Sequence, residues 1–310
     1  MLDQQFEICF EPYRAVVSTY GASLRSFSRH SASQSEREIL WGYSGNGNKK
    51  GGQGDVLIPF PGRVVGGAYR FGGVSHQMKL NDKDGPNAIH GFLRTASWEI
   101  ESREASRVTF RREIRSDEYE GYPFSLSVRV SYAVNVNGLE TRFEITNSGN
   151  GPAPVGAGFH PYFTVGTDRI NEARLQFRSA KFLEFGPGLL PTGRWIATPG
   201  SEVDFSLEKP IGDLKFNHCF AELERDRDGI ARVRFSHPEN REVTLWMDES
   251  FQYLVLYTGD AIPGTDARRA LAIEPMTCAT DAFNRPDWGL VSLGPGESLR
   301  GSFGVSDSEG

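Results

Sequence analysis

His160 lies in segment 156–163 (Gly-Ala-Gly-Phe-His-Pro-Tyr-Phe), where one imidazole stands among glycine and aromatic residues. Histidine is the side chain best suited to pass a proton near neutral pH, and aromatic side chains line many small-molecule pockets. Pro161 favours an extended backbone at His160, while Gly156 and Gly158 carry no side chains that would fill the space beside it. We therefore expect the imidazole to face a cavity. The alternative is a hydrogen-bonded core histidine.

Arg63 ends segment 58–63 (Ile-Pro-Phe-Pro-Gly-Arg). Two prolines and a glycine predict a rigid, non-helical turn that projects the guanidinium. An arginine held in this way can donate two parallel hydrogen bonds to ligand oxygens, including sugar hydroxyls. The alternative is a structural arginine that binds loop carbonyls.

His90 and Asn217 are two further polar candidates. His90 is followed by Gly91, and a glycine there lets backbone or a ligand come close. Asn217 belongs to segment 216–220 (Phe-Asn-His-Cys-Phe), which reads as a strand. Alternation then places Asn217 and Cys219 on one face, and His218 on the other face with the two phenylalanines.

Glu274 ends an apolar strand just before Pro275. A carboxylate in such a place is rarely buried without a partner or a purpose. Enclosure would raise its pKa toward the range that a general base needs. The alternative is an ion pair with Arg268 or Arg269.

Two other chemistries use the same residue types. Two histidines and one carboxylate can hold zinc or iron, but the sequence has no HxxxH or HExxH pair, so we predict no metal. A glycosidase usually needs a second carboxylate beside Glu274. Asp248 and Asp281 are the candidates for that partner.

Short alternating segments must position these residues, and helical patterns are nearly absent. Asn137-Gly138 predicts a hairpin with a type I′ turn, and 35 glycines and 17 prolines punctuate the chain. These signals predict an all-β fold: a large antiparallel β-sandwich with one domain over residues 1–310. The strand-like segments cover residues 107–114, 125–134, 139–146, 173–177, 232–235, 242–246 and 253–257.

Composition narrows the class of protein. The net charge is −6 and the basic residues are scattered, which argues against nucleic-acid binding. Three widely spaced cysteines without a CxxC pair fit free thiols in a reducing compartment. The N-terminus has no signal-peptide pattern, and no apolar run approaches the roughly 20 residues of a membrane helix. We therefore expect a cytoplasmic protein.

The glycine-rich loop 43–52 is not followed by a helix, so it does not predict a phosphate cradle.

These segments, in this order, resemble the aldose 1-epimerase (galactose mutarotase) family. The resemblance implies a galactose-mutarotase-like β-sandwich with a sugar cleft on one concave sheet. It also implies interconversion of the α and β anomers of a free aldose without a cofactor. The matching features run from about residue 20 to residue 297: the PxPGRV turn, Asn87-Ala88-Ile89-His90-Gly91, the Gly-Phe-His-Pro-Tyr-Phe strand, Asn217-His218-Cys219-Phe220, residues 251–260 and Glu274-Pro275.

The resemblance also implies roles for single residues. Glu274 would be the base at the C1 hydroxyl, and His160 would be the acid at the ring oxygen. His90 and Arg63 would hold hydroxyls and stabilise charge as the ring opens. The further residues predicted to contact the sugar are Asn217, Tyr162 and Phe163.

One departure from the family pattern concerns Asn217, where similar proteins usually carry Asp. An amide both donates and accepts hydrogen bonds, so the preferred hydroxyl pattern can differ. A phosphorylated or sulfonated sugar is therefore an alternative substrate, with Arg63 and Arg94 as sources of positive charge. A non-catalytic sugar-binding or sensing protein is a second alternative. His30, His76 and His237 match no motif and are expected at structural or surface positions. The sequence does not specify the oligomeric state.

Overall fold

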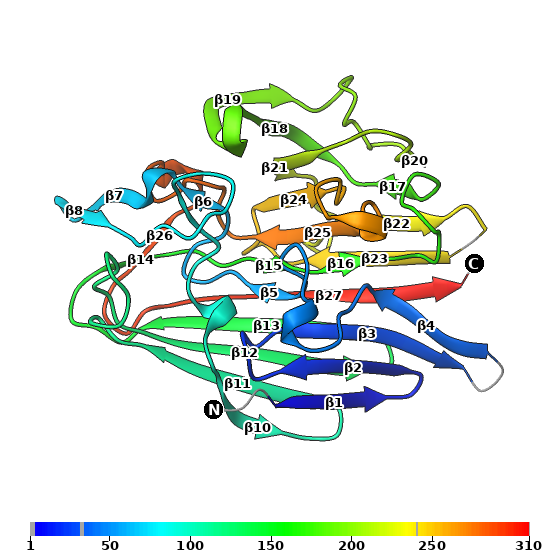
Figure 1. Ribbon diagram of the computed structural model, residues 1–310, viewed down its shortest axis with the longest axis horizontal. Coiled ribbons are helices and arrows are strands. Elements are labelled where there is room, and N and C mark those ends of the chain that lie inside the picture. Colours follow the sequence, from blue (N-terminus) through cyan, green and yellow to red (C-terminus); the bar gives the residue numbers. More distant parts are fainter. Residues whose placement is uncertain (1–3, 32–33, 240, 310) are drawn as a thin grey trace.

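The computed structural model describes residues 4–31, 34–239 and 241–309. Strands account for 49% of the residues and helices for 6%, and two large antiparallel sheets dominate the molecule (Figure 1). The all-β prediction is therefore confirmed. No helix in the described ranges has the length and apolar character needed to span a membrane.

The first sheet has ten strands, in the spatial order β1 (Gln5–Phe10), β2 (Tyr13–Ser18), β3 (Leu24–Ser31), β4 (Gln34–Leu40), β16 (Tyr162–Phe163), β25 (Leu271–Met276), β24 (Tyr253–Tyr257), β21 (Asn217–Leu223), β18 (Ser179–Phe185) and β19 (Pro191–Ala197). The second has nine, in the order β10 (Glu99–Arg103), β11 (Arg107–Ile114), β12 (Leu126–Asn135), β13 (Gly138–Asn147), β27 (Ser298–Glu309), β23 (Arg241–Met247), β22 (Ala231–His237), β17 (Arg174–Gln176) and β20 (Lys209–Pro210).

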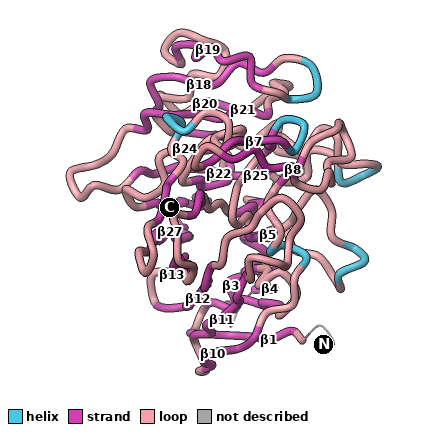
Figure 2. The backbone as a smooth tube through the Cα atoms, turned by 90° about the vertical axis from the view of Figure 1, so that its left-hand side faces the viewer, coloured by secondary structure: helices cyan, strands magenta, loops and turns pink. Residues whose placement is uncertain are grey.

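Smaller elements form the loops that flank the sheets. Figure 2 shows the helices as short isolated turns between strands. The strand pairs are β5 (Asp55–Val56) with β15 (Phe159–His160), β6 (Arg63–Val64) with β9 (Ala88–Ile89), β7 (Ala68–Phe71) with β8 (Val74–Gln77), and β14 (Ala153–Val155) with β26 (Val291–Leu293). The 3-10 turns are η1 (Asn46–Asn48), η2 (Val65–Gly67), η3 (Leu93–Thr95), η4 (Pro187–Leu189), η5 (Gly264–Asp266) and η6 (Pro286–Trp288).

One cluster of buried apolar side chains joins the two large sheets. Phe27 and Leu254 enter it from the ten-stranded sheet, and Val130 and Val305 enter it from the nine-stranded sheet. Residues on one side of each strand therefore form the core, which leaves the alternate residues for the outer face. Side chains on the outer face of the ten-stranded sheet line the cavity described below.

The seven predicted strands are present, and β11 and β24 have the predicted bounds. The hairpin between β12 and β13 is also confirmed, but the type I′ turn is wrong. The two turn residues are Val136 and Asn137, and of Asn137 and Gly138 only the glycine has a positive φ, 114°. The side chain of Asn135 accepts the Asn137 N–H at 2.7 Å, which stabilises this local turn.

Candidate functional site

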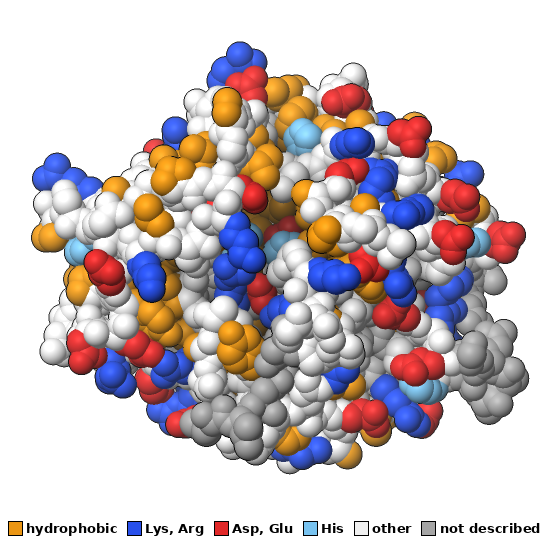
Figure 3. All heavy atoms as spheres, in the orientation of Figure 1, with side chains coloured by type: hydrophobic (Ala, Val, Ile, Leu, Met, Phe, Trp, Pro, Cys, Tyr) orange, Lys and Arg blue, Asp and Glu red, His pale blue; other side chains and the backbone are white. Residues whose placement is uncertain are grey.

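A cavity of about 660 Å³ lies against the ten-stranded sheet and brings most of the predicted site residues together. In Figure 3 this face of the molecule is hollowed near its centre, with histidine and acidic side chains at the base and basic side chains beside the opening. Arg63, His90, His160, Asn217 and Glu274 all line the cavity. They come from five separate segments of the chain.

Strands β21, β24 and β25 form the floor. Cys219 pairs with Val255, and Val255 pairs with Glu274, so these three side chains lie side by side across the sheet. Asn217 and Tyr257 form the next row toward the edge of the cavity. The predicted shared face of Asn217 and Cys219 is therefore confirmed.

His160 and Glu274 are in direct contact. The Nε2 atom of His160 lies 3.3 Å from Oε1 of Glu274, and the two residues are only 6% and 2% exposed. Burial lowers the pKa of His160 to about 3 and raises the pKa of Glu274 well above its usual value. Burial thus disfavours a charge on either group, and the pair is suited to share one proton.

The packing around His160 differs from the prediction in one respect. Methyl groups added at Gly156 and Gly158 would lie 2.4 Å from Cys278 Sγ and 2.8 Å from Pro61 Cβ. The missing side chains at these two glycines therefore make room for Cys278 and Pro61, and not for the imidazole. The glycine beside His160 is Gly52, where an added methyl group would lie 3.2 Å from the Cδ2 atom of the ring.

His90 faces the same cavity, with its ring centre 5.6 Å from that of His160. Its Nδ1 atom accepts the Gly62 N–H at 3.2 Å, so the neutral ring carries its proton on Nε2. Burial, together with the nearby His160, lowers the pKa of His90 well below its usual value. His90 is therefore a hydrogen-bond donor at neutral pH. Gly91 packs tightly, since an added methyl group would lie 2.1 Å from the Ile58 carbonyl oxygen.

Arg63 combines both roles considered from its sequence. Its Nε donates to the Asp82 carboxylate at 2.8 Å, and Nη2 lies 3.7 Å from Asp84. The side chain still lines the cavity and is 11% exposed. Asp82 thus orients the guanidinium, which leaves its remaining N–H groups for a ligand.

Tyr162 and Phe163 do not line the cavity, so the structure does not support the prediction that they contact the sugar. Both side chains are fully buried. The Tyr162 ring stacks on His160 with centres 5.1 Å apart, and its hydroxyl donates to the Gly51 carbonyl at 2.8 Å. Phe163 belongs to the core between the sheets. Tyr162 pairs with Ala272 in the row of Asn217 and Tyr257, so its ring lies on the cavity side of the sheet but is covered by its neighbours, including Ile262. The next residue, Phe163, points to the opposite face.

The ion-pair alternative for Glu274 is not supported. Arg268 binds Asp260, and Arg269 lies near Glu38 and Asp266. Glu274 instead contacts His160.

The carboxylates considered for a glycosidase lie outside the cavity. Asp248 caps a turn at Ser250 and Ser302, and Asp281 accepts the Val65 N–H. Among the described residues, no group of three or more His, Cys, Asp or Glu side chains is arranged to hold a metal ion.

The three remaining unassigned histidines lie outside the cavity. His30 contacts Glu36, His76 stacks on Tyr69, and His237 accepts the Glu239 N–H. These positions agree with the structural or surface roles expected for them.

Several lining residues were not found from the sequence. Lys83 and Lys215 come from two polar loops, and in the described part of the chain neither forms an ion pair. Apolar side chains also line the cavity, at Phe185, Leu189 and Ile262. Loop residues carry no periodic signal, so only their position in space assigns them to the site.

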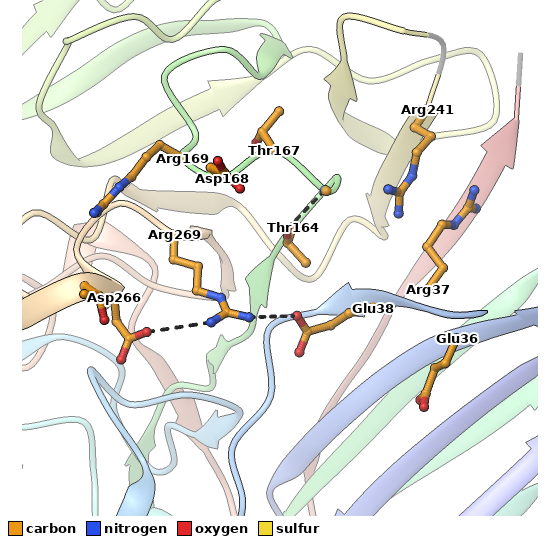
Figure 4. A pocket seen from close by; sticks show the side chains of 12 residues that line it. Glu36, Arg37, Glu38, Thr164, Thr167, Asp168, Arg169, Arg241, Asp266 and Arg269 are labelled. Atoms are coloured by element: carbon orange, nitrogen blue, oxygen red, sulfur yellow. Dashed lines mark hydrogen bonds and ion pairs between the residues drawn. The ribbon is translucent and has the colours of Figure 1, made fainter. Parts of the chain in front are cut away.

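A second cavity, of about 780 Å³, lies elsewhere and contains none of the predicted site residues. Figure 4 shows its arginines and carboxylates, with Arg269 between Glu38 and Asp266. Thr164 accepts the Gly166 N–H at 3.2 Å. Arg269 is thus paired with two carboxylates of this cavity, whereas the first cavity holds the buried acid and imidazole.

The chain is similar to known proteins in both sequence and fold. The family model described as aldose 1-epimerase matches residues 4–306. The uncharacterized protein YihR of Escherichia coli K12 is 30% identical over 233 residues, which are 74% of this chain and 71% of YihR. A galactose mutarotase from Sus scrofa is 26% identical over 266 residues, 79% and 75% of the two chains. The structure of an aldose epimerase homologue from C. elegans aligns over 99% of both chains, with a TM-score of 0.89 and 20% identity.

Proposed function

The chain belongs to the aldose 1-epimerase family, and we propose that it is an isomerase that interconverts the α and β anomers of a free aldose. The observation that carries this proposal is the buried contact between His160 and Glu274 at the base of an open cavity. Anomer exchange needs one proton removed and one delivered, and this pair supplies both functions without a cofactor.

The reaction is balanced within the pair. Glu274, as carboxylate, takes the proton of the C1 hydroxyl, while protonated His160 gives its proton to the ring oxygen. The bond between C1 and the ring oxygen breaks and the C1 carbonyl forms. After rotation about the C1–C2 bond, the reverse transfers close the ring on the other face. The resting pair holds its one proton on Glu274, because burial lowers the pKa of His160 to about 3 and raises the pKa of Glu274. Transfer of that proton to His160 forms the reactive state, and ring opening leaves a proton on Glu274 again.

Two neighbours support the transfer. His90 is neutral and presents Nε2–H, so it donates a hydrogen bond to a sugar oxygen without competing for the proton. Arg63 is held by Asp82 and adds a fixed positive charge near the opening ring. Asn217 supplies an amide that both donates and accepts.

Polarimetry tests this proposal. The purified protein should accelerate the change in optical rotation of freshly dissolved glucose, galactose or a related aldose. Saturable sugar binding without acceleration across the panel would instead identify a non-catalytic binding or sensing protein. We place the reaction in the cytoplasm because the three cysteines are free thiols.

A second candidate substrate is an anionic sugar, which Lys83 and Lys215 favour because both line the cavity and neither is neutralised by an ion pair among the described residues. Arg94 is not available for this purpose, since it contacts Asp55 and lies outside the lining. Replacing Lys83 and Lys215 with Met should raise KM for a phosphorylated or sulfonated aldose and leave KM for the neutral aldose unchanged. An equal effect on both sugars would reject this substrate class.

A further inference from the structure

Asp55 is a buried carboxylate for which the catalytic roles above give no purpose. Its side chain is 4% exposed, forms an ion pair with Lys49, and lies 3.4 Å from Nη1 of Arg94. Lys49 and Arg94 are themselves mostly enclosed, at 13% and 24% exposure. A buried charge cluster of this kind carries a desolvation cost, and it lies directly beside the site.

The backbone ties this cluster to the imidazole. Asp55 pairs with His160 across the β5–β15 ladder, and the Gly54 N–H donates to the His160 carbonyl at 2.9 Å. A methyl group added at Gly52 would lie 3.2 Å from the His160 ring and 3.4 Å from Oδ2 of Asp55. The cluster and the imidazole are therefore neighbours across one glycine.

The charges of the cluster act on the proton of the catalytic pair. Burial is the largest cause of the lowered pKa of His160, and the charges of Arg94 and Lys49 lower it further. Burial is also the largest cause of the raised pKa of Glu274, and the charge of Asp55 raises it further. The imidazole also faces Glu274 itself, the neutral His90 and the stacked Tyr162. Cys219 and Tyr257 face Glu274 from β21 and β24. Beyond His90, Arg63 adds a positive charge that lowers the pKa of His90.

We propose that Asp55, with Lys49 and Arg94 bound to its carboxylate, is a positioning residue that sets how strongly the pair of His160 and Glu274 holds its shared proton. The proposal rests on the anomer-exchange function, and Asp55 does not line the cavity. Its carboxylate balances two cations that would otherwise oppose protonation of the pair. Removal of a positive charge should therefore raise the proton affinity of the pair, and removal of the negative charge of Asp55 should lower it.

Three charge-removing variants test the proposal through the pH profile of kcat. The active form of the pair carries one proton, so the profile should have an acidic limb and an alkaline limb. Lys49→Met and Arg94→Met should each move both limbs to higher pH, by about half a pH unit or more. Asp55→Asn should move both limbs to lower pH by a similar amount. A purely structural role gives no such opposite displacements.

Asp307 provides the matched control. Its side chain is 1% exposed and contacts Arg29 and Arg37, and none of these three residues lines the cavity. Asp307→Asn should lower the thermal unfolding midpoint to a similar extent as Asp55→Asn but leave the limbs of the pH profile in place. If Asp55→Asn does not fold, the two cation variants carry the test. Unmoved limbs, or displacement in one direction by all variants, would overturn the proposal.

The ring ¹⁵N signals of His160 give a readout that does not need activity. They are assigned as the signals lost in His160→Gln, and their pH midpoint should rise in Arg94→Met and Lys49→Met relative to the wild type. If the wild-type protein accelerates no aldose but these midpoints move as stated, the anomer-exchange function fails while the role of Asp55 stands. If activity is present and the midpoints do not move, only the role of Asp55 fails.

Discussion

His160 Nε2 lies 3.3 Å from Glu274 Oε1, although the two residues belong to different sheets. His160 is in the two-stranded pair β5–β15, and Glu274 is in the ten-stranded sheet. The contact forms because Gly158 bridges to Met276, two residues beyond Glu274. A short distance between a buried imidazole and a buried carboxyl is the relationship from which most of the following predictions derive.

Glu274→Gln should retain sugar binding and lower kcat about 10²- to 10⁴-fold, because a neutral amide cannot accept the C1 hydroxyl proton. Polarimetry gives kcat and calorimetry gives the binding constant. Glu38→Gln, in the second cavity, should leave both values unchanged. Full activity of Glu274→Gln would place the base elsewhere.

His160 should make the protein less stable in acid. Because the pKa of His160 is lowered to about 3 in the folded protein, the unfolded chain takes up a proton first as the pH falls. This contribution is complete above the unfolded value near 6.5 and is lost as the pH falls toward 3. The free energy of unfolding of the wild type should therefore decline more steeply than that of His160→Gln between pH 7 and pH 4. Urea denaturation at several pH values measures this difference, and parallel curves would contradict it.

Gly52→Ala should reduce kcat through contact with the imidazole. The residue has a φ of 81°, so alanine adds backbone strain of about 1–2 kcal/mol as well as a methyl group 3.2 Å from His160. Gly45→Ala is the matched control, since Gly45 has a φ of 71° and open space around it. Both variants should lose stability in thermal unfolding, but only Gly52→Ala should lose substantial turnover. Equal kcat values would show that the close approach is unimportant.

Tyr162→Phe removes the hydrogen bond to the Gly51 carbonyl and keeps the ring that stacks on His160. We expect a loss of about 1 kcal/mol in the free energy of unfolding and a severalfold fall in kcat, because Gly51 precedes the glycine that contacts the imidazole. KM should change little, since Tyr162 does not line the cavity. A large rise in KM would restore the tyrosine as a direct sugar contact.

Asn217→Asp should alter the ranking of aldoses, because a carboxylate only accepts hydrogen bonds whereas the amide also donates. The ratio of kcat/KM values for two aldoses that differ at one hydroxyl should change by about tenfold. Polarimetry of glucose and galactose with both proteins measures that ratio. An unchanged ratio across the panel would remove Asn217 from the specificity-determining residues.

Local patterns in the sequence determined the strands and the types of residues that carry the chemistry. Period-2 alternation located β11 and β24 with their bounds, because one side of each strand must enter the core. The setting of Glu274 before Pro275 marked it as a candidate base, and the structure shows that its side chain is buried. These features depend on neighbours within a few residues along the chain.

Only the tertiary structure decided which residues meet. It covered Tyr162 with neighbouring residues and turned Phe163 into the core, and it brought Lys83, Lys215 and Gly52 to positions that their loop sequences do not predict. It also joined Asp55 to Lys49 and Arg94 beside His160. Such contacts depend on the order of strands in the sheets and on loop paths, and these are set by packing between segments far apart in the chain.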